Sequence, residues 1–350
     1  MPDMGRTEID GVRKLLAGVT LGLTIMVCAS RTDGTVGWCG WGLRGLDGFG
    51  KLHWRDEVMM MRRGICWFLG VLLVMACGVG VVEAASDDAA IKLVVRADDI
   101  GSCHTANLAC IQSYREGIAR SVEVQVCCPW FNEAAKMLRE NPGYDVGVHL
   151  TLTSEWENYK WGPLTAAPSL VDSQGHFFPT TSQRSSFPPN TGFLQCGWKI
   201  EEVEKELRAQ IELAKKAIPQ VSHLSSHMGT PTCTPELRAL VQRLAAEYKL
   251  TVETPGARHL RWGVDSKATA QQREAALVKA LEDLKSGVWI LVEHPGLDTA
   301  EMQAMGHKGY WEVASHRDGV TKSFTSPRVK EVIKRRGIQL ASYADLWPAP

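Results

Sequence analysis

The sequence predicts an α/β protein built on a parallel β-sheet, either closed as a barrel or wound on both faces. From residue 91 onward, short apolar runs alternate with amphipathic helical runs, which is typical of repeated β-α-β units. Acidic and imidazole residues follow several of the apolar runs. Parallel α/β folds carry their chemistry at the carboxyl ends of the strands, so this placement agrees with the same fold class.

The first part of the pattern contains three expected strands and two expected helices. Residues 91–95 are mostly β-branched and apolar, as in a strand that is covered on both faces. We expect strands at residues 92–97, 121–127 and 146–152, and helices at residues 105–116 and 130–140. A stretch rich in Pro, Ser, Thr and Gly then runs from residue 154 to about residue 197. Loops of that length inside a domain are usually functional or disordered.

The second part of the pattern continues the alternation to the end of the chain. We expect helices at residues 199–217, 234–249, 268–285 and 326–336. We expect strands at residues 221–226, 250–253, 288–293 and 338–341. Pro235 suits the first turn of its helix, where the missing amide proton has no cost. The pattern therefore contains about seven strands separated by helices.

Residues 58–85 have the composition of a secretory signal peptide. Met61-Arg62-Arg63 is followed by about a dozen apolar residues, too few to span a bilayer comfortably. Val82-Glu83-Ala84 then offers small residues at the spacing that signal peptidase recognises. We expect export to the periplasm or the cell exterior, with a lipid anchor at Cys77 as the weaker alternative. Residues 1–57 precede this signal and are expected to be an untranslated or disordered preface.

Composition argues against a nucleic-acid partner. The 350 residues include 39 Lys and Arg and 39 Asp and Glu, and no basic run of the kind that tracks a phosphate backbone is present. Six cysteines follow residue 85, and they form no CxxC pair, which argues against a structural zinc site. An exported protein can form disulfides, but the sequence does not show a pairing. We expect no stable membrane span after residue 85. The sequence allows a homo-oligomer but does not determine the oligomeric state.

Acidic or imidazole side chains stand at four of the expected strand ends: Asp98 and Asp99, His149, His223 with His227, and His294. Each has an ordinary explanation on its own, as a helix cap, a turn or a buried and satisfied histidine. Together they point to function, because the carboxyl ends of parallel strands meet at one edge of the fold.

One carboxylate and two imidazoles suit a divalent metal with positions left open for water and substrate. A second carboxylate beside such a metal can take a proton from water, and a further histidine can return one to a leaving group. A bound cation would also offset the repulsion between Asp98 and Asp99. Two imidazoles favour zinc or another transition metal, but the sequence does not separate zinc from magnesium.

Four motifs in this order resemble the YdjC-like carbohydrate deacetylases, which are related to the polysaccharide deacetylases. They are Ala97-Asp98-Asp99-Ile100-Gly101 with Asn107, Gly147-Val148-His149-Leu150-Thr151-Leu152, Ser222-His223-Leu224-Ser225-Ser226-His227, and His294-Pro295-Gly296. The resemblance implies an irregular (β/α) barrel of about seven strands, formed by residues 86–350 as a single catalytic domain. It also implies a hydrolase that uses one divalent metal to remove acetyl groups from N-acetylated sugars or oligosaccharides.

The resemblance also implies roles for individual residues. Asp98 would be the general base, and His294 would be the general acid near the leaving amine. The metal ligands would be Asp99, His149 and His227.

The sequence departs from the family pattern at three places. Ser225 stands where the family usually has an aspartate, Arg96 where it usually has an asparagine, and Met228-Gly229-Thr230 where further histidines are common. A missing carboxylate behind a metal ligand would lower metal affinity, or it would mark a different substrate.

The loop after residue 152 supplies candidate substrate contacts. Trp156, Tyr159 and Trp161 lie close together in the sequence, and sugars stack their apolar C–H faces on aromatic rings. We expect these three residues and His223 to contact the carbohydrate, with ordinary loop packing as the alternative for the aromatic residues.

Two other functions are compatible with the same residues. One is a metal-dependent hydrolase of another ester, amide or phosphodiester, although phosphate-binding glycine loops are absent from the sequence. The other is a non-catalytic exported carbohydrate-binding protein, which would be expected to lack a base or a ligand.

Overall fold

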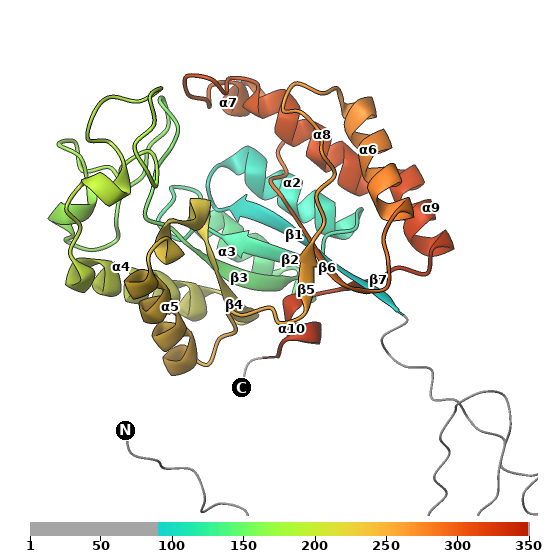
Figure 1. Cartoon of the computed structure of the whole chain (residues 1–350), viewed down its shortest axis with the longest axis horizontal. Coiled ribbons are helices and arrows are strands. Elements are labelled where there is room, and N and C mark those ends of the chain that lie inside the picture. The colour runs from blue at the N-terminus through green and yellow to red at the C-terminus, as the bar shows by residue number, and fades with distance from the viewer. Residues whose placement is uncertain (1–89, 349–350) are drawn as a thin grey trace, which may run out of the picture. The chain divides into compact units, whose positions relative to one another are not determined.

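The computed structural model describes residues 90–348, which form one curled parallel sheet of seven strands with helices around it (Figure 1). The strands are β1 (Ile91–Ile100), β2 (Ser121–Val124), β3 (Asp145–Leu150), β4 (Val221–Ser226), β5 (Ala257–His259), β6 (Gly287–Glu293) and β7 (Gln339–Ala341). Six of them lie in the order β4-β3-β2-β1-β6-β5, and β7 pairs with β1. The predicted α/β fold class with a barrel-like sheet is therefore confirmed.

Strand β1 lies in the middle of this sheet. One of its edges pairs with β6 from Ile91 to Ala97. Its other edge is shared, because β7 pairs with the first part of β1 and β2 pairs with the part from Arg96 to Ile100. All these pairs are parallel, so the carboxyl end of β1 is surrounded by the carboxyl ends of its neighbours.

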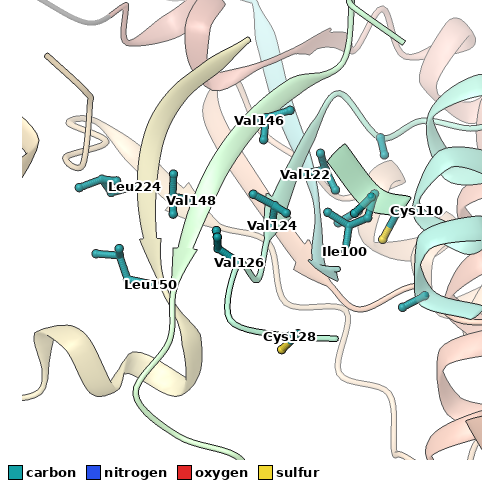
Figure 2. Close-up of a cluster of buried hydrophobic side chains, with 14 of the residues drawn as sticks. Ile100, Cys110, Val122, Val124, Val126, Cys128, Val146, Val148, Leu150 and Leu224 are labelled. Atoms are coloured by element: carbon teal, nitrogen blue, oxygen red, sulfur yellow. The ribbon is translucent and has the colours of Figure 1, made fainter. Parts of the chain in front are cut away.

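The two faces of the sheet differ in character because successive side chains of a strand point to opposite faces. One face is apolar and packs under the helices, with Val122, Val124, Val146 and Val148 in its core (Figure 2). The alternate residues are mostly polar. On this mostly polar face, near the start of β1, Val94, Ile290, Ala341 and Tyr343 form a small second core.

The helices and 3₁₀ turns surround the sheet. They are α2 (His104–Arg115), α3 (Phe131–Arg139), η2 (Pro168–Leu170), η3 (Phe193–Gln195), α4 (Ile200–Ala217), η4 (His227–Thr232), α5 (Pro235–Tyr248), α6 (Ala270–Glu282), α7 (Ala300–Gln303), α8 (Val313–Thr325), α9 (Pro327–Arg335) and α10 (Tyr343–Leu346). Local sequence explains several boundaries. Thr234 caps the helix that begins with Pro235, and Thr269 and Gln272 form a capping box at the start of α6.

One expected strand was wrong. Residues 250–253 contribute only an isolated bridge between Thr251 and His223, and the strand forms later, at Ala257–His259. Pro255 cannot donate to a ladder, and Gly256 has a φ of 78°, so the chain turns before it can pair with β6.

Helix α8 was not expected from the sequence. Its residues include Gly319 and several Ser and Thr, which have low helix propensity. Packing explains the helix, because a Cβ on Gly319 would lie 2.6 Å from Cδ of Arg273. Glycine at this position thus lets α8 approach α6 closely, and that approach places the inner side of α8 beside the end of β1.

Residues 151–199 are mostly irregular, as expected, and they form the long connection between β3 and α4. All six cysteines within residues 90–348 are free thiols. In the same part of the chain, no helix is both long enough and apolar enough to cross a membrane. The expected preface at residues 1–57, the signal peptide at residues 58–85 and the anchor at Cys77 lie outside the described residues.

Candidate active site

A cavity of about 560 Å³ lies where the carboxyl ends of the strands meet. Five of the residues predicted from the motifs border it: Asp98, Asp99, His149, His227 and His294. They come from β1, β3, the start of η4 and the residue after β6. The topology therefore brings together the groups that the sequence placed at separate strand ends.

The two neighbouring aspartates face the same cavity because of a local change in the backbone. In an extended strand, adjacent side chains would point to opposite faces. Asp99 instead has a φ of 75°, in the left-handed region that aspartate tolerates better than most residues. The irregularity falls between Ala97 and Ile100 in the register of β1 with β2. It turns both carboxylates toward one space, and such local strain is typical of functional sites.

Asp98 is held from behind by Arg96. The guanidinium donates from Nε to Oδ1 and from Nη2 to Oδ2, both at 2.8 Å. This two-bond geometry fixes the plane of the carboxylate as well as its position. Arg96 is one of the departures from the family pattern, and its function in this structure is to orient Asp98.

Only one oxygen of the Asp99 carboxylate accepts a hydrogen bond from the described residues. Arg317 on α8 donates from Nη2 to Oδ2 of Asp99 at 2.8 Å. The other carboxylate oxygen, Oδ1, is buried and has no hydrogen-bond partner within the described residues. A buried carboxylate oxygen without a partner is costly, so this atom is suited to receive a cation.

Two histidine nitrogens approach that free oxygen. Nε2 of His149 lies 3.7 Å from Oδ1 of Asp99, and Nδ1 of His227 lies 3.6 Å from it. One ligand atom from each of the three residues falls within 4.8 Å of the others. Ligand atoms at about 2.1 Å from a tetrahedral zinc ion lie about 3.4 Å apart. The donor set and its spacing therefore fit a divalent metal.

The nitrogen of each histidine that faces away from this point has its own partner. Nδ1 of His149 lies 2.7 Å from Oγ of Ser225, and Nε2 of His227 lies 3.0 Å from Oε2 of Glu155. Metal-binding histidines usually donate their outer N–H in this way, which sets the tautomer and the ring orientation. The side-chain amide of Gln125 also lies 3.0 Å from Nδ1 of His227.

The surroundings shift the pKa values of all three candidate ligands. Burial lowers the pKa of His149 to about 4, so its ring is neutral. Burial alone would raise the pKa of Asp99, but Arg317 above all, then His294 and His227, hold this pKa well below its ordinary value. Burial also opposes a charge on His227, yet Glu155 and Asp99 outweigh it and raise the pKa of His227 to about 10. The acidic surroundings of His227 thus favour a positive charge, which a cation would also supply.

His294 is positioned by the contact between its own loop and α8. Gly296 donates from its backbone N to the carbonyl of Arg317 at 3.2 Å, and Thr321 Oγ1 donates to the carbonyl of Gly296 at 2.7 Å. A Cβ on Gly296 would lie 2.8 Å from Cβ of Arg317. Glycine after His294-Pro295 therefore lets α8 pack closely against this loop. The same contact between Gly296 and α8 positions both His294 and Arg317.

Only one of the four expected carbohydrate contacts borders the cavity, and that residue is Trp156. Trp161 is buried, and its indole N–H donates to the carbonyl of Thr153 at 2.8 Å. The hydroxyl of Tyr159 donates to the carbonyl of Ser102. These two aromatic residues hold the loop in place.

The expected substrate contact of His223 is not compatible with its position. The residue is fully buried, its ring stacks on Tyr343 with centroids 4.0 Å apart, and its Nε2 lies 2.7 Å from Oε1 of Glu123. Because it lies one layer below the cavity, it supports the site from within the sheet.

Three site residues were missed by the sequence reasoning: Glu155, Gln125 and Arg317. Glu155 adjoins Trp156 in the loop that was predicted to contact the carbohydrate. It could therefore have been predicted as a site residue, because it is an acid next to a candidate sugar-binding aromatic residue. Gln125 lies on the polar face beyond β2, two residues after Glu123. Arg317 had no signal, since it belongs to the helix that the pattern did not predict.

The fold and the site together define a protein with a parallel, barrel-like α/β sheet and a possible metal-binding cluster at the carboxyl ends of its strands. Comparison with known families agrees with this class. The chain belongs to the YdjC-like protein family, whose model matches residues 92–335.

Two relatives share the name carbohydrate deacetylase. The carbohydrate deacetylase of Brevibacillus brevis is 26% identical over 270 residues, covering 73% of this chain and 99% of the relative. Carbohydrate deacetylase 1 of Listeria innocua is 27% identical over 252 residues, covering 72% of this chain and 94% of the relative. A crystal structure from Enterococcus faecalis, described as a putative cellobiose-phosphate cleavage protein, is 25% identical with a TM-score of 0.59. That alignment covers 73% of this chain and 99% of the crystallised chain.

Proposed function

We propose that the protein is a hydrolase that removes acetyl groups from N-acetylated sugars or oligosaccharides with the help of one divalent metal. The observation that carries this proposal is that Oδ1 of Asp99 has no hydrogen-bond partner among residues 90–348, while two imidazole nitrogens lie 3.6 and 3.7 Å from it. The names of the relatives from Brevibacillus brevis and Listeria innocua support the carbohydrate and the acetyl group.

Asp99, His149 and His227 would hold the metal. A divalent cation bound there would polarise the acetyl carbonyl and make a nearby water more acidic. A site with two imidazoles and one carboxylate suits zinc or another transition metal better than magnesium. We therefore propose a transition metal as the resident ion.

Asp98 is the proposed general base. Its Oδ2 lies 3.7 Å from Nε2 of His149, so the carboxylate is beside the proposed metal position without being held by the same contacts as Asp99. Arg96 keeps the carboxylate in one plane, facing the cavity. In this position Asp98 accepts a proton from the water as that water attacks the carbonyl carbon.

His294 is the proposed general acid. It borders the same cavity as Asp98 but directly follows β6, on the other side of β1 from His149 and His227. The C–N bond of the acetamide can break only if the departing nitrogen receives a proton. His294 donates that proton, and the products are acetate and the free amino sugar.

Acetate release tests the proposal directly. The purified protein would be treated with EDTA and then offered a panel of N-acetylated mono- and oligosaccharides, with zinc, cobalt, manganese or magnesium restored one at a time. We expect release only with a metal present. Release that persists in EDTA would contradict the metal, and a metal-loaded protein that cleaves none of these sugars would contradict the acetylated carbohydrate.

We also propose that the protein is exported and that residues 58–85 are removed as a signal peptide. The support is the basic segment, the short apolar run and the small residues near Ala84. N-terminal sequencing of the protein recovered from its native cells tests this. A mature chain that begins near Ser86 is expected, and a chain that retains residues 58–85 would contradict the proposal.

A further inference from the structure

A chain of buried polar side chains lies directly behind His149. Nδ1 of His149 is 2.7 Å from Oγ of Ser225, and this hydroxyl donates to Oε2 of Glu123 on the neighbouring strand β2. The other oxygen of Glu123 is 2.7 Å from Nε2 of His223. Glu123 and His223 are fully buried, and Ser225 is 9% exposed. The chain therefore links a candidate metal ligand to a carboxylate that has no contact with the cavity.

The available protons fix the direction of each hydrogen bond. Burial alone would raise the pKa of Glu123, but His223 and Arg96 hold this pKa well below its ordinary value, so the carboxylate is ionised and only accepts. Ser225 has a single hydroxyl proton, which it gives to Glu123. Its oxygen must then accept from His149, which places the ring proton of His149 on Nδ1.

This assignment leaves the lone pair of His149 on Nε2. That nitrogen is the one that lies 3.7 Å from the free oxygen of Asp99. The polar chain thus selects the tautomer that can bind a metal, and it also fixes the plane of the ring. An isolated neutral histidine would divide itself between two tautomers.

The strands are built to contain this chain. Glu123 and His223 pair in register with Gly147 from its two sides, and His149 pairs with Ser225 two positions further along. A Cβ on Gly147 would lie 2.5 Å from Nε2 of His223 and closer still to Oε2 of Glu123. Glycine in the middle strand therefore makes room for a carboxylate and an imidazole to meet across it.

We propose that Ser225 and Glu123 are positioning residues for the metal ligand His149. The carboxylate of Glu123 fixes the hydroxyl of Ser225 through one hydrogen bond, and this hydroxyl fixes the ring of His149 through the next, so the three groups act as one relay. The proposal rests on the metal centre of the proposed function. It gives Ser225, which replaces the aspartate usual in the family, a role that the sequence alone could not show.

Metal affinity of the full-length protein tests the proposal without reference to turnover. Cobalt(II) would be titrated into the metal-free protein and followed by its visible absorption, for the wild type, Ser225→Ala, Ser225→Thr and Ser113→Ala. Ser113 is the matched control, because its hydroxyl is also buried but has no partner within the described residues. Nitrogen-15 NMR of the metal-free protein would report the tautomer of His149.

Loss of the hydroxyl of Ser225 is expected to weaken cobalt binding about 10- to 100-fold, as is typical when the partner of a metal-binding histidine is removed. His149 should then populate both tautomers, whereas Ser225→Thr and Ser113→Ala should resemble the wild type. Wild-type cobalt affinity in Ser225→Ala would overturn the positioning role and leave the metal centre intact. A wild type that binds no cobalt would instead contradict the metal centre, and the positioning role with it.

A second pair of variants separates the carboxylate from general damage to the sheet. Ser225→Asp places two buried carboxylates against each other, so cobalt binding should weaken. Adding Glu123→Gln removes one charge and lets the new aspartate accept directly from His149, so the double variant should recover affinity to within about tenfold of the wild type. A double variant that binds no better than Ser225→Asp alone would count against the relay.

Discussion

Arg317 on α8 forms a buried ion pair with Asp99 at the end of β1, with Nη2 and Oδ2 2.8 Å apart. The two residues are 6% and 2% exposed. The pair uses one oxygen of the carboxylate and leaves the other for a cation. It also lets an acid stay ionised in a place where burial alone would favour its protonated form.

Arg317→Met should destabilise the metal-free protein by about 3–5 kcal/mol, because it leaves the Asp99 charge buried without its partner. Urea unfolding measures the loss. Arg243→Met is the control, because the side chain of Arg243 is about half exposed and solvent screens its ion pair with Glu204, so this substitution should have a much smaller effect. Added zinc should restore part of the stability of Arg317→Met by supplying a positive charge to Asp99. Equal effects of the two substitutions would show that the buried pair has no special role.

Asp98→Asn should lower kcat for acetate release by about 10²- to 10⁴-fold, which is the range typical of a lost general base. The amide keeps the size of the side chain but cannot accept the proton of the attacking water. Metal content should remain one ion per chain, because Asp98 is not among the proposed ligands. Full activity in this variant would contradict the assignment of Asp98 as the base. Loss of the metal would indicate that Asp98 is a metal ligand instead.

The residues at the strand ends could be predicted because strand periodicity and parallel topology together determine where they lie. Asp98, His149 and His227 could be placed together because the carboxyl ends of parallel strands meet, and all three border the cavity. The strand at Ala257–His259 could not be placed, because three residues after a Pro-Gly turn carry almost no periodic signal. Helix α8 was missed because packing on α6 overrides the weak helix propensity of its residues.

The supporting groups were harder to predict for a different reason. Ser225 was read as the loss of a carboxylate, since the sequence shows neighbours along one strand and not across two. The register of β2, β3 and β4 brings Glu123 to the place where that carboxylate was missing. Likewise, His223 is one motif residue among several in the sequence, and only its burial shows that it faces Glu123 and not the cavity.

Trp156→Leu should raise KM for an N-acetylated sugar about fivefold to tenfold with a smaller change in kcat, because an aromatic surface contributes on the order of 1 kcal/mol to such contacts. Trp156 borders the cavity, and its ring stacks near His307 with centroids 5.8 Å apart. Tyr159→Phe is the control, since it removes only the hydroxyl that donates to the carbonyl of Ser102. Steady-state kinetics of both variants would decide the matter. A higher KM in Tyr159→Phe, with no change in Trp156→Leu, would reverse the two roles.

Gly147→Ala should destabilise the protein by about 1–3 kcal/mol, because the new Cβ would lie 2.5 Å from Nε2 of His223 and closer still to Oε2 of Glu123. Thermal unfolding of the variant would show the loss. The same substitution in a Glu123→Ala background should cost less, since the carboxylate that crowds this position is then gone. If the two effects simply add, the crowding across β3 is not the cause.

His316 should make the protein less stable as the pH falls below about 6.5. Its ring borders the cavity, and its Nδ1 lies 2.6 Å from the hydroxyl of Tyr310. Burial first, and then the positive charges of Arg273 and Arg317, lower the pKa of His316 from 6.5 to about 4, although Glu312 acts in the opposite direction.

The sign follows from proton binding. Between pH 6.5 and about 4 the unfolded chain binds a proton at this residue and the folded chain does not, so the free energy of unfolding decreases as the pH falls through this window. Below about pH 4 both states bind the proton and the contribution stops changing. His316→Gln should therefore flatten the decline between these limits, as measured by urea unfolding at a series of pH values with matched ionic strength. An NMR titration of the wild type that finds His316 protonating near pH 6.5 would contradict the prediction, because the folded and unfolded chains would then bind that proton equally.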